Sequence, residues 1–167
     1  MSAVVAVAAI TATFACAPTD ELTPDTACPV VDRIVGSVRA LGAEPGPASA
    51  TELAETYGAL AEDYRSLAGV LGDDAGVASA ERMADLLADA ADAVDRVEVA
   101  DRDGLIAAIS ELPEVADMAA QVNANLPLGL DRATSDELFE VCDPDLSGLV
   151  QPAVEGPGLW PDPPADP

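Results

Sequence analysis

Apolar residues recur along most of the chain at steps of three and four, which place their side chains on one face of an α-helix. The strongest such periodic signal lies between residues 53 and 71. Its members are Leu53, Tyr57, Leu60, Tyr64, Leu67 and Leu71. Because this spacing is heptad-like, it predicts a long helix that packs along its length against another helix.

The same spacing predicts four further helices, over residues 29–41, 77–98, 101–125 and 134–142. Glycines and aspartates at residues 72–76 form a short break between the helices over 53–71 and 77–98. These two helices are of similar length and should therefore form an antiparallel hairpin. Pro113 removes a backbone donor inside the fourth predicted helix. We expect it to kink or split that helix.

Polar residues mark the starts of these helices. Ser49 or Thr51 can cap the second helix, and Ser49-Ala50-Thr51-Glu52 fits a capping box. Other candidate N-caps are Asp101 or Asp103 for the fourth helix and Thr134 or Ser135 for the short fifth one.

Composition points to the same fold class. Half of the residues are hydrophobic, but only 3% are aromatic, and alanine is abundant. A core of Ala, Leu and Val favours closely packed helices over sheets. The sequence therefore predicts an all-α protein, an up-and-down bundle of about four helices plus a short fifth.

The charge balance is strongly acidic. The chain has 31 Asp and Glu residues against seven basic residues, all of them Arg, and no His, for a net charge of −24. Such a charge opposes binding to nucleic acid and electrostatic attraction to anionic lipid. It favours cations or a basic protein as a partner. The alternative is that the charge only keeps the protein soluble in a crowded or salty exterior.

The first part of the chain has the pattern of an export signal. Residues 3–15 are uncharged and almost wholly apolar, too short to span a bilayer but suited to the hydrophobic region of a signal peptide. Thr13-Phe14-Ala15-Cys16 then resembles the lipobox of bacterial lipoproteins, in which a small residue precedes the cysteine that is diacylated. The resemblance implies a lipid anchor on Cys16 at the outer face of the cell membrane. A signal peptide ordinarily begins with Lys or Arg, so we expect the native start to lie upstream of Met1.

The three cysteines fit this interpretation. If Cys16 is acylated, Cys28 and Cys142 are left to pair as a disulfide that clasps the first helix to the last. In the loop-entropy model, a cross-link over such a long loop contributes about 4–5 kcal/mol. A metal site or a catalytic thiol lacks partners, because the sequence contains no His.

These patterns divide the chain into four parts. We expect a signal peptide over residues 1–15, a polar tether over 16–27, the helical bundle domain over 28–150, and a mobile tail over 151–167. The tail contains six prolines among 17 residues, which neither a helix nor a central strand tolerates.

The segment after the last helix is a candidate calcium loop. Asp143, Asp145 and Ser147 supply oxygen side chains at alternate positions, and Glu155 follows near the usual place of the bidentate ligand. No second helix is expected after this segment, because Pro152 and Pro157 follow. The alternative is a helix stop at Asp143 with an Asx turn.

Two features are candidates for partner binding. Four acids lie along one stripe of the predicted helix 77–98, namely Glu81, Asp85, Asp89 and Asp92. They could form a docking face for a basic envelope protein or for cations, or only a solvated helix face. Trp160, in the proline-rich tail, could anchor a short recognition segment.

The residue inventory predicts a protein that is not an enzyme and holds no cofactor, with calcium as the one candidate ion. Without His there is no Ser-His-Asp triad, and without Lys there is no Schiff-base or P-loop lysine. The chain resembles the small helical lipoproteins of high-GC Gram-positive bacteria, which implies a surface-anchored interaction module. The alternatives are an exported binder of cations or small ligands, and an acidic secreted protein without a lipid.

Overall fold

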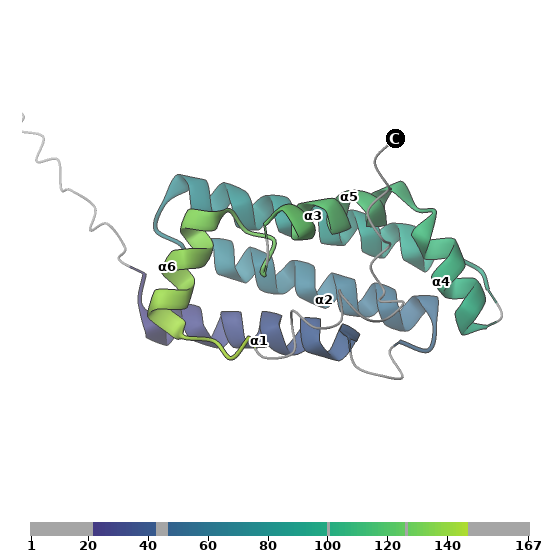
Figure 1. Cartoon of the computed structure of the whole chain (residues 1–167), viewed down its shortest axis with the longest axis horizontal. Coiled ribbons are helices and arrows are strands. Elements are labelled where there is room, and N and C mark those ends of the chain that lie inside the picture. Colours follow the sequence, from purple (N-terminus) through teal and green to yellow (C-terminus); the bar gives the residue numbers. More distant parts are fainter. Residues whose placement is uncertain (1–21, 43–46, 100, 126, 147–167) are drawn as a thin grey trace, which may run out of the picture.

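The computed structural model describes residues 22–42, 47–99, 101–125 and 127–146 (Figure 1). Over these residues the chain forms helices and no strand. The helices are α1 (Pro24–Gly42), α2 (Ala50–Ala68), α3 (Asp74–Asp95), α4 (Arg102–Ser110), α5 (Pro113–Ala124) and α6 (Arg132–Cys142). The predicted all-α class is confirmed.

Four helices run side by side in alternating directions (Figure 1). Helix α1 packs on α2, α2 packs along its length on α3, and α3 packs on α5. The short α4 lies at one end of the bundle, and α6 crosses the other end, where α1 begins (Figure 1). The predicted up-and-down bundle is therefore confirmed. The fourth predicted helix is divided at Pro113, which is the first residue of α5.

The hairpin of α2 and α3 supplies much of the core. All six residues of the heptad-like run from Leu53 to Leu71 are buried. Helix α3 contributes the side chains that face inward, namely Ala80, Met83, Ala84, Leu87, Ala90, Ala93 and Val94. The many alanines on α3 allow the two helix backbones to approach closely, as the composition predicted.

The first helix begins earlier than predicted. Helix α1 starts at Pro24, and the backbone N–H groups of Thr26 and Ala27 both donate to the Thr23 carbonyl at 3.1 Å. Pro24, and not Pro29, is the proline of the first turn, and Pro29 lies inside the helix. The expectation of a tether up to residue 27 was therefore wrong, because residues 24–27 belong to α1.

The third helix also begins earlier than predicted. Asp73 caps α3 by accepting a hydrogen bond from the Gly76 N–H at 2.8 Å. Gly76 was interpreted as part of a break, but it is buried in the first turn of the helix. A Cβ atom at Gly76 would lie 2.7 Å from Asp73 Oδ2, so the glycine allows the cap to close tightly.

Two of the predicted caps are confirmed, and one is wrong. Ser49 caps α2, and Asp101 rather than Asp103 caps α4. Helix α6 is capped by Asp131, which accepts hydrogen bonds from the Thr134 N–H at 3.1 Å and the Thr134 hydroxyl at 2.6 Å. Thr134 and its neighbour Ser135, the predicted caps, are instead buried in the first turn of α6.

The predicted disulfide pair is confirmed. The sulfur atoms of Cys28 and Cys142 lie 2.16 Å apart, and the Cα atoms lie 5.2 Å apart. The bond joins α1 to the last residue of α6, across 114 positions of sequence. It thus holds α6 against the end of the bundle at which α1 begins. In the described part of the chain, no helix is both long enough and apolar enough to cross a membrane.

Candidate interaction surface

A row of four carboxylates follows the outer face of α3. Glu81, Asp85, Asp89 and Asp92 are all exposed, and we call them the acidic stripe. At 100° of rotation per residue they lie on the opposite side of the helix from Met83, Leu87 and the other buried positions. The predicted stripe therefore lies on the outside of a helix whose inner face is fixed by the core.

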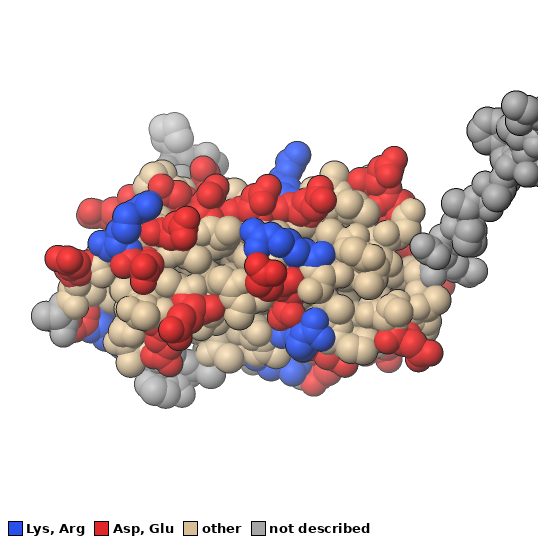
Figure 2. Space-filling model, turned by 180° about the vertical axis from the view of Figure 1, so that it is seen from behind, with Lys and Arg blue, Asp and Glu red and all other residues tan. Residues whose placement is uncertain are grey.

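The stripe is not neutralised by arginines. The ion pairs among the described residues are Arg33–Asp63, Arg39–Asp145, Arg65–Glu62 and Arg132–Asp136, and none includes a stripe residue. Arg82 on α3 and Arg96 at its C-cap are also exposed, yet neither pairs with the stripe within the described residues. Figure 2 shows acidic side chains across much of one face of the molecule, with several basic groups lying among them.

This arrangement costs some stability. Like charges three or four residues apart on a helix repel each other by about 0.2–0.5 kcal/mol per pair. A face of this kind attracts cations and positively charged protein surfaces. Because the carboxylates have no described ion-pair partner, they can bind such a group without first breaking an internal pair.

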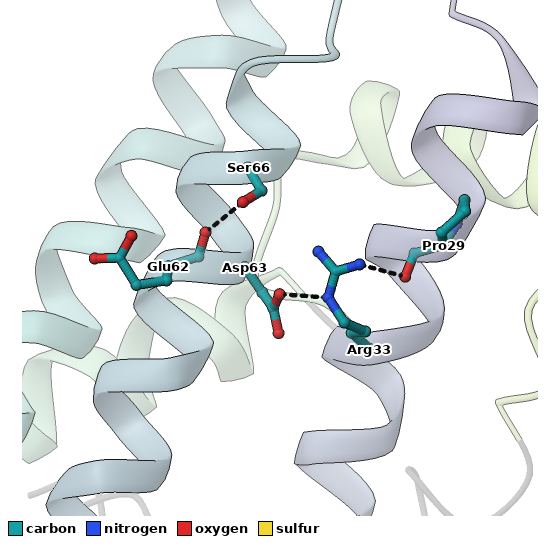
Figure 3. Close-up of polar contacts among 5 residues, drawn as sticks. All are labelled: Pro29, Arg33, Glu62, Asp63 and Ser66. Atoms are coloured by element: carbon teal, nitrogen blue, oxygen red, sulfur yellow. Dashed lines mark hydrogen bonds and ion pairs between the residues drawn. The ribbon is translucent and has the colours of Figure 1, made fainter.

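Another charged contact has a structural role. Arg33 on α1 forms an ion pair with Asp63 on α2, with 2.8 Å between Nε and Oδ1, and also donates to the Pro29 carbonyl at 3.2 Å (Figure 3). The Asp63 side chain is only 16% exposed. On α2, the Ser66 hydroxyl donates to the Glu62 carbonyl at 2.9 Å. These groups join or stabilise helices, so they are not candidates for partner binding.

The candidate calcium loop is only partly within the described residues. Asp143 ends α6 in the left-handed conformation, with φ of 42°, as the alternative of a helix stop predicted. Asp145 forms an ion pair with Arg39 at 3.3 Å, and Arg39 also donates to the Asp145 carbonyl. Ser147 and Glu155 lie outside the described residues. Within the described ranges, no three His, Cys, Asp or Glu residues converge as a metal site would require.

Other candidate residues lie outside the part of the chain that the structure describes. These are Cys16, proposed as the lipidation site, and Trp160, proposed as an anchor in the tail. The signal peptide at residues 1–15 and the tail at residues 151–167 lie there as well. The predictions about these residues stay predictions.

The two tyrosines of α2 belong to the core. Tyr57 and Tyr64 are 1% and 3% exposed. Burial raises the pKa of Tyr57 to about 12, and it raises the pKa of Tyr64 further in the same direction. The Tyr64 hydroxyl donates to the buried Leu128 carbonyl at 2.5 Å. Both residues therefore pack inside the bundle, as their place in the heptad-like run predicted.

A hollow of about 460 Å³ lies between the end of α5 and α6. Its lining includes the Phe139 ring, Leu130 and the amide side chains of Asn123 and Asn125. No pattern in the sequence predicted this hollow, although its two asparagines are the only ones in the chain. The Asn125 side-chain amide donates to the Gln121 carbonyl at 3.2 Å, so it stabilises the C-terminal end of α5.

Comparison with known proteins gives no relative: no family model, no curated protein and no solved structure matches the chain.

Proposed function

We propose that the protein is an exported, lipid-anchored helical module that binds a basic protein of the cell envelope through the acidic stripe of α3. The observation that carries the binding proposal is that all four carboxylates are exposed and have no ion-pair partner among the described residues. The rest of the proposal is supported by the sequence of the leader and by the pairing of the cysteines.

The cysteines support export and anchoring. Disulfides persist in oxidising compartments outside the cytosol, and Cys28 and Cys142 are at bonding distance. Their pairing leaves one cysteine of the three, Cys16, which occupies the acylated position of the lipobox-like sequence. A diacylated Cys16 would place the bundle next to the membrane, where it could meet other proteins of the envelope.

The acidic stripe is suited to binding a partner and is not needed for the stability of α3. The inner face of α3 buries eight residues, so α3 does not need the stripe to stay in place. Neutralising the stripe should even relieve repulsion along the helix. A loss of binding after neutralisation would then be separable from a loss of fold. No enzymatic activity is proposed, because the sequence contains neither His nor Lys.

The test replaces the stripe by its isosteric amides, with Glu81→Gln, Asp85→Asn, Asp89→Asn and Asp92→Asn in one variant. A matched control neutralises four exposed acids elsewhere, with Asp32→Asn, Asp103→Asn, Glu111→Gln and Asp117→Asn. Both variants change the net charge by four, so a difference between them reports position and not overall charge.

The measurement is chemical cross-linking on intact cells, followed by quantitative mass spectrometry of the proteins joined to each variant. We expect a basic envelope protein to be joined to the wild type and to the control, and to be lost from the stripe variant. The cross-linking yield should also fall as salt is added, because the attraction is screened. If the stripe variant and the wild type recover the same proteins in the same amounts, the proposed surface is wrong.

A further inference from the structure

We infer that α6 is a redox-released latch: reduction of the Cys28–Cys142 bond frees α6 from the end of the bundle while α1, α2, α3 and α5 stay folded. The inference rests on how little of α6 is buried, on the hollow beside it and on the position of its two attachments. It does not depend on the acidic stripe or on the lipid anchor.

Helix α6 contributes little to the core. Its buried residues are Thr134, Ser135 and Leu138, and only Leu138 among them is apolar. Phe139 and Cys142 are partly buried and also pack against the core. Helices α2 and α3 each bury eight residues. A helix of 11 residues is too short to persist alone in water, so α6 depends on its contacts with the bundle.

Packing around α6 is incomplete. The helix lies against α1 and touches α3. On the side of α5 it borders the hollow of about 460 Å³, to which it contributes Arg132, Ser135, Asp136 and Phe139. Side chains that line an open hollow lack packing contacts on one side. The side of α6 that faces α5 therefore adds little to the stability of α6 on the bundle.

Two attachments hold the ends of α6. At its start, the Asp131 N–H donates to the Ser79 hydroxyl of α3 at 2.8 Å, and the Asp131 carboxylate caps the helix. At its end, Cys142 is bonded to Cys28. The Arg39–Asp145 pair lies just beyond this end, but both side chains are exposed, and exposed ion pairs stabilise little. The Cys28–Cys142 disulfide is therefore the main interaction that keeps the C-terminal half of α6 attached to the bundle.

The core of the other helices does not need α6. The heptad-like run of α2 and the inner face of α3 bury each other along the whole hairpin, and α1 and α5 cover its two sides. Loss of α6 would uncover Leu138 and the apolar ends of α1 and α3 that α6 covers. The bundle would then present an apolar surface only in its reduced form.

The chemistry is thiol–disulfide exchange with an external dithiol. Both cysteines are partly buried residues, and the exchange requires that an attacking thiolate reach one of the two sulfur atoms. It forms a mixed disulfide with one cysteine and expels the other as a thiolate, which takes up a proton. The second thiol of the reductant then displaces the first cysteine. The protein disulfide becomes two thiols, and the dithiol is oxidised to a disulfide.

The test is hydrogen–deuterium exchange of the full exported chain, before and after treatment with dithiothreitol under native conditions. Alkylation and mass spectrometry verify the reduction. We expect the amides of α6 to lose roughly tenfold or more of their protection, because the cross-link no longer restricts the opened chain. Amides of α2 and α3 serve as the internal control and should keep their protection. Loss of protection throughout the chain, no change in α6, or resistance to the reductant would each overturn the inference.

A variant provides the second arm. Cys28→Ser with Cys142→Ser should exchange like the reduced protein whether or not dithiothreitol is present. Its helical circular dichroism should fall only by the share that α6 contributes. Failure of this variant to fold would contradict the inference, because the inference requires that the other helices stay folded without the disulfide.

Discussion

The hydrogen bond of Tyr64 fixes the turn that leads into α6. The hydroxyl lies on α2 and donates to the Leu128 carbonyl at 2.5 Å, where Leu128 is 2% exposed. Replacing Tyr64 by Phe removes the donor and leaves this carbonyl buried without it. Such a loss costs about 1–2 kcal/mol, the net value of the bond plus part of the desolvation of its acceptor.

Tyr57 provides a matched control on the same helix face. Its side chain is 1% exposed, and no hydrogen bond joins its hydroxyl to the described residues. Since no buried side-chain oxygen among these residues lacks a partner, the Tyr57 hydroxyl is less deeply buried than that of Tyr64. We therefore expect Tyr57→Phe to change the free energy of unfolding by less than about 0.5 kcal/mol. In a chain of this size, about 1–2 kcal/mol corresponds to a fall in the melting temperature of roughly 2–8 °C for Tyr64→Phe.

The assay is urea unfolding at pH 7, followed by circular dichroism and repeated for the wild type and each variant. Only Tyr64→Phe should shift the midpoint, and the slope of the transition should stay constant. Equal free energies of unfolding for Tyr57→Phe and Tyr64→Phe would refute the reasoning, because only Tyr64→Phe removes a buried hydrogen bond.

Three further predictions concern the effects of two glycine substitutions, of low pH and of added salt on the stability of the protein. Gly36 has open space around its Cβ position, so Gly36→Ala should raise the melting temperature, whereas Gly76→Ala should lower it because its Cβ would meet Asp73. A thermal melt of the two variants compares them directly. The hydrogen bond from the Thr134 hydroxyl lowers the pKa of Asp131. The ionised Asp131 carboxylate therefore contributes to the free energy of unfolding above its unfolded-state pKa, and this contribution is lost as pH falls through the lower folded-state pKa. The difference in free energy of unfolding between the wild type and Asp131→Asn should become smaller at low pH. A gap that is constant with pH would contradict this. Finally, added NaCl should raise the melting temperature, because it screens the repulsion of a net charge of −24; a melting temperature independent of NaCl would count against dominant repulsion.

The helical hairpin could be predicted because one periodic signal defined it. The residues from Leu53 to Leu71 repeat at helical spacing, and only one face of α2 could accept them all. The acidic stripe followed from the same periodicity, since residues opposite a buried face must be exposed. Both predictions needed only local spacing along one helix.

Helix starts were harder to predict, because several residues nearby could serve as the cap. Pro29 suited a first turn as well as Pro24, and only the hydrogen bonds to Thr23 distinguish them. Thr134 and Ser135 are residue types that favour an N-cap. The carboxylate of Asp131, three residues before Thr134, instead accepts the hydrogen bond from the Thr134 backbone N–H and caps the helix. Competition of this kind depends on tertiary position and not on residue type.

The remaining features depend on contacts between distant parts of the chain. The pairing of Arg39 with Asp145 spans 106 positions, so the sequence of the loop alone could not show that one candidate calcium ligand has an internal partner. The hollow beside α6 depends on the angle at which α6 crosses the bundle. No local pattern encodes that angle.

The central claim is that the protein is exported and held at the membrane by a lipid on Cys16, with Cys28 and Cys142 joined. The most direct measurement is peptide-level mass spectrometry of the protein made in a native-like host from its natural start. We predict acyl chains on Cys16 as the first residue of the mature chain, and a single cross-linked peptide that contains Cys28 and Cys142. An unmodified Cys16 in a chain cleaved elsewhere, or left uncleaved, would contradict the account.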